Sequence, residues 1–208
     1  MSLAQALANG LTELRIVVSE PSQVRLIQYL ELIEKWNKVH NLTAIRGLEQ
    51  MLVHHLLDSL AVLPHLGSAR SLLDVGSGAG LPGIPLAMVQ PELAVTLLDS
   101  SYKRQAFQLQ CKAELGLDNA TAVHSRVEDY RNEPGFDVVV SRAFSDLGEF
   151  VSAARHLCSP GGRLLAMKGL FPHDEIAKLP KGATVSQVRE LKIPGLNASR
   201  HLIEVKVN

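Results

Sequence analysis

The hydrophobic pattern of the first third of the chain predicts helices. In residues 22–41 the apolar side chains recur every three or four positions and form one stripe, made of Leu26, Tyr29, Leu30, Ile33, Trp36 and Val39. Ser22 is expected to be the N-cap of this helix. Residues 49–63 repeat the same spacing, and residues 2–16 are expected to form a further helix that is broken or weakened at Asn9 and Gly10.

From about residue 69 the pattern changes to short apolar runs that alternate with helical stretches. We expect strands at 71–75, 94–98, 120–124, 136–141 and 163–167, with helices at 82–89, 101–115 and 146–157. Such alternation is typical of βαβ units, whose parallel strands are covered by helices on both faces. A short helix at 173–178 and two strands at 184–193 and 201–207, joined by a turn, predict an antiparallel pair at the C-terminus.

We therefore expect an α/β fold with a mostly parallel sheet. Residues 1–66 would form an N-terminal helical cap, and residues 67–208 would form the sheet domain. No linker-like composition separates the two parts, so we expect them to fold as one compact unit.

Composition narrows the class of protein. The chain has 208 residues, 46% hydrophobic, with 21 basic and 21 acidic residues. This apolar fraction excludes disorder, and no run approaches the roughly 18 apolar residues that a membrane span needs. A zero net charge disfavours an obligate polybasic nucleic-acid binder, although it allows a local basic patch. Residues 1–10 lack the order of a secretion signal, so we expect a cytoplasmic protein in which Cys111 and Cys158 are reduced core residues.

The strongest local signal is a glycine-rich loop at 76–83 that follows the first predicted strand. Glycines allow a sharp turn and the close approach of a ligand, while the following helix start offers free N–H groups. In open parallel sheets ligands bind at this crevice, outside the carboxyl ends of the strands. Gly78, Gly80 and the carboxylate of Asp99, which ends the next strand, are therefore expected to bind a cofactor, Asp99 through a ribose.

Two cofactors compete for this loop. The spacing of Gly78, Gly80 and Gly83 matches the dinucleotide fingerprint. However, Asp74 lies inside the end of the strand, where it could face a cation or organise the loop, and a helical cap precedes the motif. An acidic residue before the glycines and a second one at Asp99 favour S-adenosylmethionine, whose sulfonium tolerates a nearby carboxylate.

Several separate segments, in order, resemble the glucose-inhibited division protein B family, the bacterial 16S rRNA guanine-N7 methyltransferases. The matching segments are Lys35-Trp36-Asn37-Lys38, Asn41-Leu42-Thr43, His54-His55-Leu56-Leu57-Asp58-Ser59, Asp74 through Pro85, Leu97-Leu98-Asp99-Ser100, Lys103-Arg104, Ser125-Arg126-Val127-Glu128, Ser141-Arg142-Ala143-Phe144 and Met167-Lys168-Gly169. Together they are far more specific than the glycines alone.

The resemblance implies a Rossmann-like class I methyltransferase that transfers a methyl group from S-adenosylmethionine to one guanine in the decoding-region (530) loop of 16S rRNA. It also implies that Gly76 and Leu81 line the cofactor pocket, that Val127 and Glu128 lie beside the adenine, and that Arg142 closes the site.

The residues suit methylation of a ring nitrogen. Guanine N7 carries a lone pair and no proton, so orientation and exclusion of water should dominate over proton transfer. The chain lacks the Asp/Asn-Pro-Pro-aromatic motif of amino-group methylation after its fourth strand, and neither cysteine lies where a covalent mechanism needs a nucleophile. We expect no metal, since His54 and His55 are adjacent and no third ligand keeps metal spacing.

For substrate binding and catalysis we single out Arg142 and Lys168, which follow neighbouring strand ends. Arg142 could donate to guanine O6 or to a carboxylate, and Lys168 to a phosphate. Phe144 could stack on an extruded base, or be a core ring. His55 and Asp58, one helical turn apart, could close over the site or form a surface pair.

Two other functions remain open at the level of sequence. A nicotinamide-dependent oxidoreductase would need a catalytic Tyr–Lys or His pair near the fourth strand, which is not found. A non-catalytic nucleotide-binding factor for ribosome assembly would not need the intact crevice. For the favoured enzyme, the modest basic surface suggests that its substrate is 16S rRNA within the small ribosomal subunit or its precursor.

Overall fold

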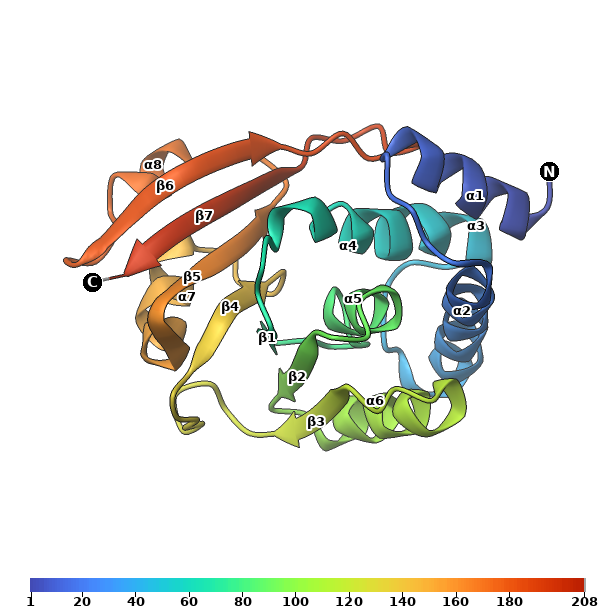
Figure 1. The fold of residues 1–208 in the computed structure, drawn as a ribbon, viewed down its shortest axis with the longest axis horizontal. Coiled ribbons are helices and arrows are strands. Elements are labelled where there is room, and N and C mark those ends of the chain that lie inside the picture. Colours follow the sequence, from blue (N-terminus) through green and yellow to red (C-terminus); the bar gives the residue numbers. More distant parts are fainter. Residues whose placement is uncertain (208) are drawn as a thin grey trace.

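The structure, a computed structural model, describes residues 1–207 and is built around one seven-stranded sheet (Figure 1). The strands are β1 (Ser71–Val75), β2 (Ala94–Asp99), β3 (Ala120–His124), β4 (Phe136–Ser141), β5 (Cys158–Lys168), β6 (Ala183–Glu190) and β7 (His201–Val207). They lie in the order β3-β2-β1-β4-β5-β7-β6, and β7 runs antiparallel to both neighbours. The expected parallel sheet with an antiparallel C-terminal pair is therefore confirmed.

The helices precede the sheet and connect its strands. They are α1 (Leu3–Glu13), α2 (Glu20–His40), α3 (Leu48–Met51), α4 (Asp58–Leu60), α5 (Gly83–Val89), α6 (Tyr102–Leu115), α7 (Leu147–Ala154) and α8 (His173–Ile176), with a π-helical segment at Leu52–Leu57 and single 3₁₀ turns at Leu63–His65 and Arg155–Leu157. No helix among residues 1–207 combines the length and the apolar character that crossing a membrane requires.

The position of β1 in the sheet indicates the edge at which a ligand would bind. This strand pairs with β2 on one side and β4 on the other, so the strand order reverses there. Val75 pairs with both Leu98 and Ser141, which brings the carboxyl ends of the three strands to the same level. Ligands bind at such a switch point in open α/β sheets because two neighbouring crossovers diverge and leave a crevice.

Alternate strand residues separate two hydrophobic clusters. Leu72, Val138 and Val140 face the side that carries α1 to α6, whereas Leu73 and Val139 face the side that carries α7. All five side chains are buried, as expected for parallel strands covered on both faces. The helices of residues 1–66 share the first cluster with β1, β2, α5 and α6. The division at residue 66 stays a prediction, while the packing supports one compact unit.

Two expectations for α2 are wrong. The helix begins at Glu20, and Ser19 is its N-cap, with a side chain that accepts from the Ser22 backbone N–H. The Ser22 hydroxyl instead donates to the carbonyl of Met88, 3.2 Å away, and so ties α2 to α5. Val39 belongs to the predicted apolar stripe but is exposed, because at 3.6 residues per turn it points away from the face that buries Leu30 and Ile33.

The other two N-terminal helices also differ from the expectation. Helix α1 runs through Asn9 and Gly10 without a break. A Cβ at Gly10 would lie 2.6 Å from a methyl carbon of Leu57, so the glycine permits a close helix–helix contact. The stretch expected as one helix at 49–63 is divided by the π-helical segment, which changes the direction of the side chains that follow it.

Candidate active site

The glycine loop is held in place by buried polar side chains. Asp74 in β1 is fully buried, and its Oδ2 accepts from the Gly83 N–H at 2.8 Å. The Tyr29 hydroxyl of α2 donates to the Ala79 carbonyl at 2.7 Å, and Gln108 of α6 donates to the Gly78 carbonyl at 2.8 Å. Of the two roles considered for Asp74, the structure shows it organising the loop.

The loop backbone requires glycine at two positions, of which Gly76 faces the crevice. Gly76 has φ +67°, and a Cβ there would lie 2.6 Å from the Cβ of Ala143. Gly80 has φ +90° and packs against Ile84 in the same way. Both positions combine a left-handed backbone with a close neighbour. A side chain at Gly76 would fill the space between the ends of β1 and β4, and one at Gly80 would collide with Ile84.

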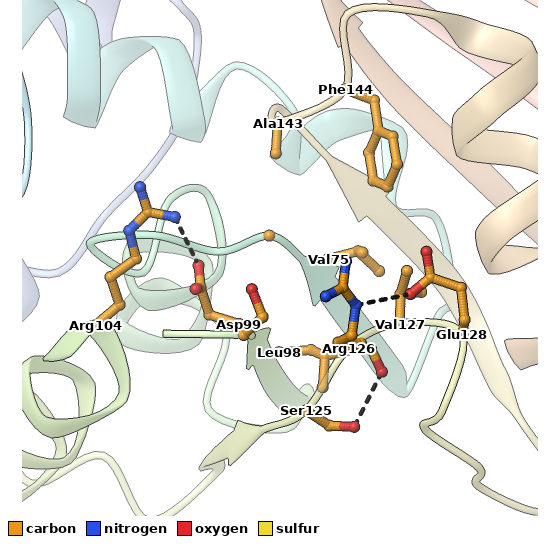
Figure 2. A pocket seen from close by; sticks show the side chains of 12 residues that line it. Val75, Leu98, Asp99, Arg104, Ser125, Arg126, Val127, Glu128, Ala143 and Phe144 are labelled. Carbon is orange, nitrogen blue, oxygen red and sulfur yellow. Dashed lines mark hydrogen bonds and ion pairs between the residues drawn. The ribbon is translucent and has the colours of Figure 1, made fainter. Parts of the chain in front are cut away.

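A cavity of about 210 Å³ opens at the ends of β1, β2 and β4 (Figure 2). Its lining includes five of the predicted cofactor and substrate residues, namely Gly76, Asp99, Val127, Glu128 and Phe144. Figure 2 shows Phe144 and Ala143 facing the cavity across from Asp99 and the 125–128 loop. We call this space the cofactor cavity.

Four predicted cofactor residues do not line this cavity. One is Arg142, which lines two neighbouring cavities instead. The other three belong to the glycine loop. Gly78 is not part of the cavity lining, and its N–H donates to the Asp99 carboxylate at 2.8 Å. Leu81 is buried in the core, and Gly80 packs against Ile84 within the loop. These residues shape the loop without lining the cavity.

The Asp99 carboxylate in the cavity wall is fixed by three hydrogen bonds. Its Oδ1 accepts from the Ser101 N–H at 2.9 Å, and its Oδ2 accepts from Gly78 and, at 3.3 Å, from Arg104. A carboxylate offers about four lone-pair positions, so one acceptor position is left for a ligand hydroxyl. Sequence reasoning missed Arg104 as a cavity residue, although it lies one helical turn into α6 from Asp99.

This lining fits S-adenosylmethionine. Asp99 offers an acceptor for a ribose diol, Leu98 and Val127 offer apolar surface for an adenine, and Glu128 offers a further carboxylate. The space that Gly76 leaves beside Ala143 allows a ligand to approach the backbone closely. These residues would therefore hold the cofactor.

A second group of predicted residues meets beside the ends of β4 and β5. Asp58 is 1% exposed, and its two carboxylate oxygens accept from Arg142 Nη1 at 3.0 Å and from Arg200 Nε at 2.9 Å. Arg142 also donates to the His54 carbonyl at 3.0 Å. Sequence reasoning missed Arg200 because it precedes β7, at the far end of the chain, with no motif around it.

His55 and Asp58 do not pair with each other. His55 Nε2 lies 3.1 Å from the Thr43 hydroxyl, and its Nδ1 is buried without a partner among residues 1–207. Burial and the nearby charge of Arg142 lower the pKa of His55 to about 4. The imidazole is therefore neutral at physiological pH. The formal net charge of this group of residues is +1, from two arginines and the one carboxylate of Asp58.

Lys168 is engaged in an ion pair at the end of β5. Its Nζ lies 2.7 Å from Glu175 Oε2 and donates to the Ser145 carbonyl, and the residue is only 9% exposed. Glu175 also accepts from the Leu147 N–H at 2.6 Å, which fastens α8 to the start of α7. An ammonium has three donors, so Lys168 keeps one donor for a ligand.

Three cavities follow one another along this edge of the sheet. A cavity of about 670 Å³ shares Phe144 with the cofactor cavity, and we call it the central cavity. A further cavity of about 390 Å³, lined by Asp58, Arg200 and His55, shares Arg142 and Lys168 with the central one. The predicted substrate residues therefore lie next to the cofactor residues, with Phe144 and Arg142 between them. Among residues 1–207 no group of three or more His, Cys, Asp or Glu side chains has metal-binding geometry.

Comparisons with known proteins agree with this arrangement. Residues 22–203 match the GidB family, rRNA small subunit methyltransferase G. The chain is 52% identical over 213 residues to the ribosomal RNA small subunit methyltransferase G of Nitrosospira multiformis, with 99% of this chain and 98% of the relative covered. It is 54% identical over 209 residues to the protein of the same name from Aromatoleum aromaticum, with 99% of each covered.

Solved structures show the same fold at lower identity. A SAM-dependent methyltransferase from Aquifex aeolicus is similar with a TM-score of 0.59 and 20% identity, over 73% of this chain and 91% of that one. The Rossmann-like methyltransferase fold is confirmed, and none of these similarities supports an oxidoreductase or a non-catalytic assembly factor. The chain belongs to the GidB family of small-subunit rRNA methyltransferases, enzymes that take their methyl group from S-adenosylmethionine.

Proposed function

We propose that the enzyme methylates N7 of a guanine in the decoding-region loop of 16S rRNA, within the small ribosomal subunit or its precursor, in the cytoplasm. The observation that carries the proposal is the shared wall of the cofactor and central cavities. Phe144 lines both, and Arg142 lines the central cavity beside it. A base in the central cavity would therefore lie next to the methyl donor and in reach of a guanidinium.

Methylation of guanine N7 requires no proton transfer by the protein, because N7 carries no proton. S-adenosylmethionine supplies a methyl group on a sulfonium centre, and guanine N7 has a free lone pair. The residues must therefore bind and orient the base and exclude water. The titratable groups of the cavity lined by Asp58, Arg200 and His55 agree with this role. Asp58 is paired with two arginines, and His55 is buried and neutral.

Arg142 is the residue that could orient the base. Both of its side-chain contacts within residues 1–207 use Nη1, which leaves Nη2 for the substrate. Guanine presents O6 and N7 side by side, so a donor to O6 places N7 at a defined position. The ring gains positive charge on methylation, and the carboxylate of Asp58 offsets the charge of Arg142 beside it.

The charge balance of the chain supports an assembled substrate. A protein with 21 basic and 21 acidic residues has little general attraction for the rRNA backbone. Contacts with a folded subunit would supply the binding that charge does not. Because N7 alkylation needs no Lewis acid, we propose that the reaction uses no metal.

The decisive experiment identifies the methylated atom. The enzyme is incubated with radiolabelled S-adenosylmethionine and small subunits from a strain that lacks the modification. The label is then mapped by nucleotide, and borohydride followed by aniline cleaves the strand at N7-methylguanine. Label on an exocyclic amine or a ribose oxygen would refute the proposal. Equal rates on protein-free rRNA and on subunits would refute the assembled substrate.

A further inference from the structure

The segment that follows β5 carries an aromatic cluster at the surface. The ring of Phe171 lies against that of His173, with centroids 4.2 Å apart, and meets His201 edge-on at 5.7 Å. His201 begins β7, and its Nδ1 lies 3.1 Å from the Gly169 carbonyl. We call Phe171, His173 and His201 the aromatic platform. It is anchored to the β5–β7 pair, where Lys168 and His201 are in register.

Phe171 of the platform is exposed, whereas the other phenylalanines of the chain are buried or half-buried. Phe171 is 39% exposed, and its neighbour Leu170 is 81% exposed. Two adjacent large apolar side chains at the surface contribute little to the core. Such an exposed apolar pair, rimmed by polar groups, is typical of an interaction site.

The platform is continuous with the proposed active site. Leu170, Phe171 and His173 line the central cavity together with Arg142 and Phe144. Phe144 also borders the cofactor cavity, whereas Phe171 does not. A base next to the methyl donor would therefore lie against Phe144, and the platform lies farther along the same cavity.

We propose that the aromatic platform stacks an unpaired base of the rRNA that neighbours the methylated nucleotide. Single-stranded RNA is recognised largely through stacking of unstacked bases on aromatic side chains. The ring nitrogens of His173 and the Nε2 of His201 add hydrogen-bonding groups at the rim, where base edges and phosphates would pass. The platform thereby holds the strand while the target base occupies the inner part of the cavity. The inference rests on rRNA as the substrate, and it is independent of which atom is methylated.

Steady-state kinetics with small subunits test the platform. Phe171→Leu keeps the apolar volume and removes the aromatic face, so we expect KM for the subunit to rise about tenfold with kcat within twofold. Phe171→Tyr should keep KM near the wild-type value. Tyr102→Leu is the matched control, because Tyr102 is also exposed and stacks on a histidine, His124, at the other end of the sheet. Total methyl incorporation is measured, so the result does not depend on the methylated atom.

A crosslink identifies what contacts the platform. Phe171→p-benzoylphenylalanine, irradiated with small subunits, should crosslink to 16S rRNA at a nucleotide close in sequence to the methylated one. An unchanged KM for Phe171→Leu, a fall in kcat alone, or a crosslink only to a ribosomal protein would each overturn the inference. Circular dichroism and urea unfolding of Phe171→Leu confirm that the variant is folded.

Discussion

Arg200 and Asp58 lie 142 positions apart in the sequence, yet Arg200 Nε donates to Asp58 Oδ1 at 2.9 Å. The other carboxylate oxygen holds Arg142, so one buried carboxylate positions two guanidinium groups at one cavity. It also joins the N-terminal helices to the end of β4 and to the start of β7. Asp58 therefore connects the three parts of the chain that form the proposed substrate side of the site.

Arg142→Ala should abolish orientation of the base and leave the fold intact. We expect kcat/KM for small subunits to fall by about 100-fold or more, equivalent to about 3 kcal/mol of transition-state binding. Arg142→Lys should recover little of this activity because an ammonium lacks the planar fork. Methyl incorporation and far-UV circular dichroism measure the two effects. Retention of more than about a third of the wild-type rate would remove Arg142 from the active site.

Asp58→Asn should reduce both stability and activity. The two guanidinium groups would lose their counter-charge, but their side chains are 26% and 24% exposed and solvent screens part of the effect. We expect urea unfolding to show a loss of about 2 kcal/mol, less than for a fully buried pair. The control is Glu128→Gln, which breaks an exposed pair with Arg126 and should cost less than about 0.5 kcal/mol. Equal losses for both variants would contradict the prediction.

Asp99→Asn should weaken cofactor binding. The amide would turn an NH₂ toward donors that Asp99 now accepts from, and it would lose the charge that favours a ribose hydroxyl. Calorimetry with S-adenosylmethionine should show affinity reduced by about 10- to 100-fold. Asp137→Asn is the matched control, because Asp137 also accepts from backbone N–H groups but at the amino end of β1. Equal affinity for the Asp99 variant and the wild type would exclude Asp99 from the cofactor site.

The Asp74 carboxyl should make stability fall as pH rises. Burial raises its pKa from 3.8 to about 7 in the folded protein. Between these two values the folded state binds the proton and the unfolded state has lost it, so the free energy of unfolding decreases with pH. This loss of unfolding free energy is absent below about pH 4 and complete above about pH 7, where it reaches roughly 4 kcal/mol.

Asp74→Asn removes this titration and keeps an oxygen to accept from Gly83. The unfolding free energy of the variant minus that of the wild type should be larger at pH 8 than at pH 4.5. His55, whose pKa is lowered to about 4, acts in the opposite direction, but it is present in both proteins and cancels in the comparison. Urea unfolding at the two pH values measures the difference. A difference that does not change with pH would show that Asp74 does not titrate in this range.

Gly10→Ala tests the contact between α1 and the π-helical segment. In an isolated helix alanine is favoured over glycine by about 1 kcal/mol. In this fold the new Cβ would lie 2.6 Å from Leu57, so we expect a net loss of about 1–3 kcal/mol in unfolding free energy. Asn9→Ala, at the exposed neighbouring position, should leave stability unchanged or raise it. A stabilised Gly10 variant would show that the two helices can move apart freely.

Local patterns were sufficient for the strands and for one residue of the proposed cofactor site. The alternation of apolar runs indicated all seven strands, because burial of one strand face or one helix stripe constrains residues that are near one another in sequence. Of the cofactor residues predicted from the loop pattern, Asp99 at the end of β2 lines the cofactor cavity, whereas Gly78 and Gly80 do not. Gly76, which also lines the cavity, was predicted from the family resemblance. Even there, the role of Leu81 in the core rather than in the cavity lining depended on how the loop packs.

Contacts between distant segments were decided only by the tertiary structure. The sequence alone marked Asp58, Arg142 and Lys168 as polar residues at useful positions. It did not indicate Arg200 as the second partner of Asp58, Glu175 as the partner of Lys168, or the exposed ring of Phe171 beside the active site. Hydrophobic periodicity reports which face of an element is buried, whereas ion pairs and cavities depend on the relative placement of elements. That placement is set by the packing of the whole core, which no short stretch of the chain encodes.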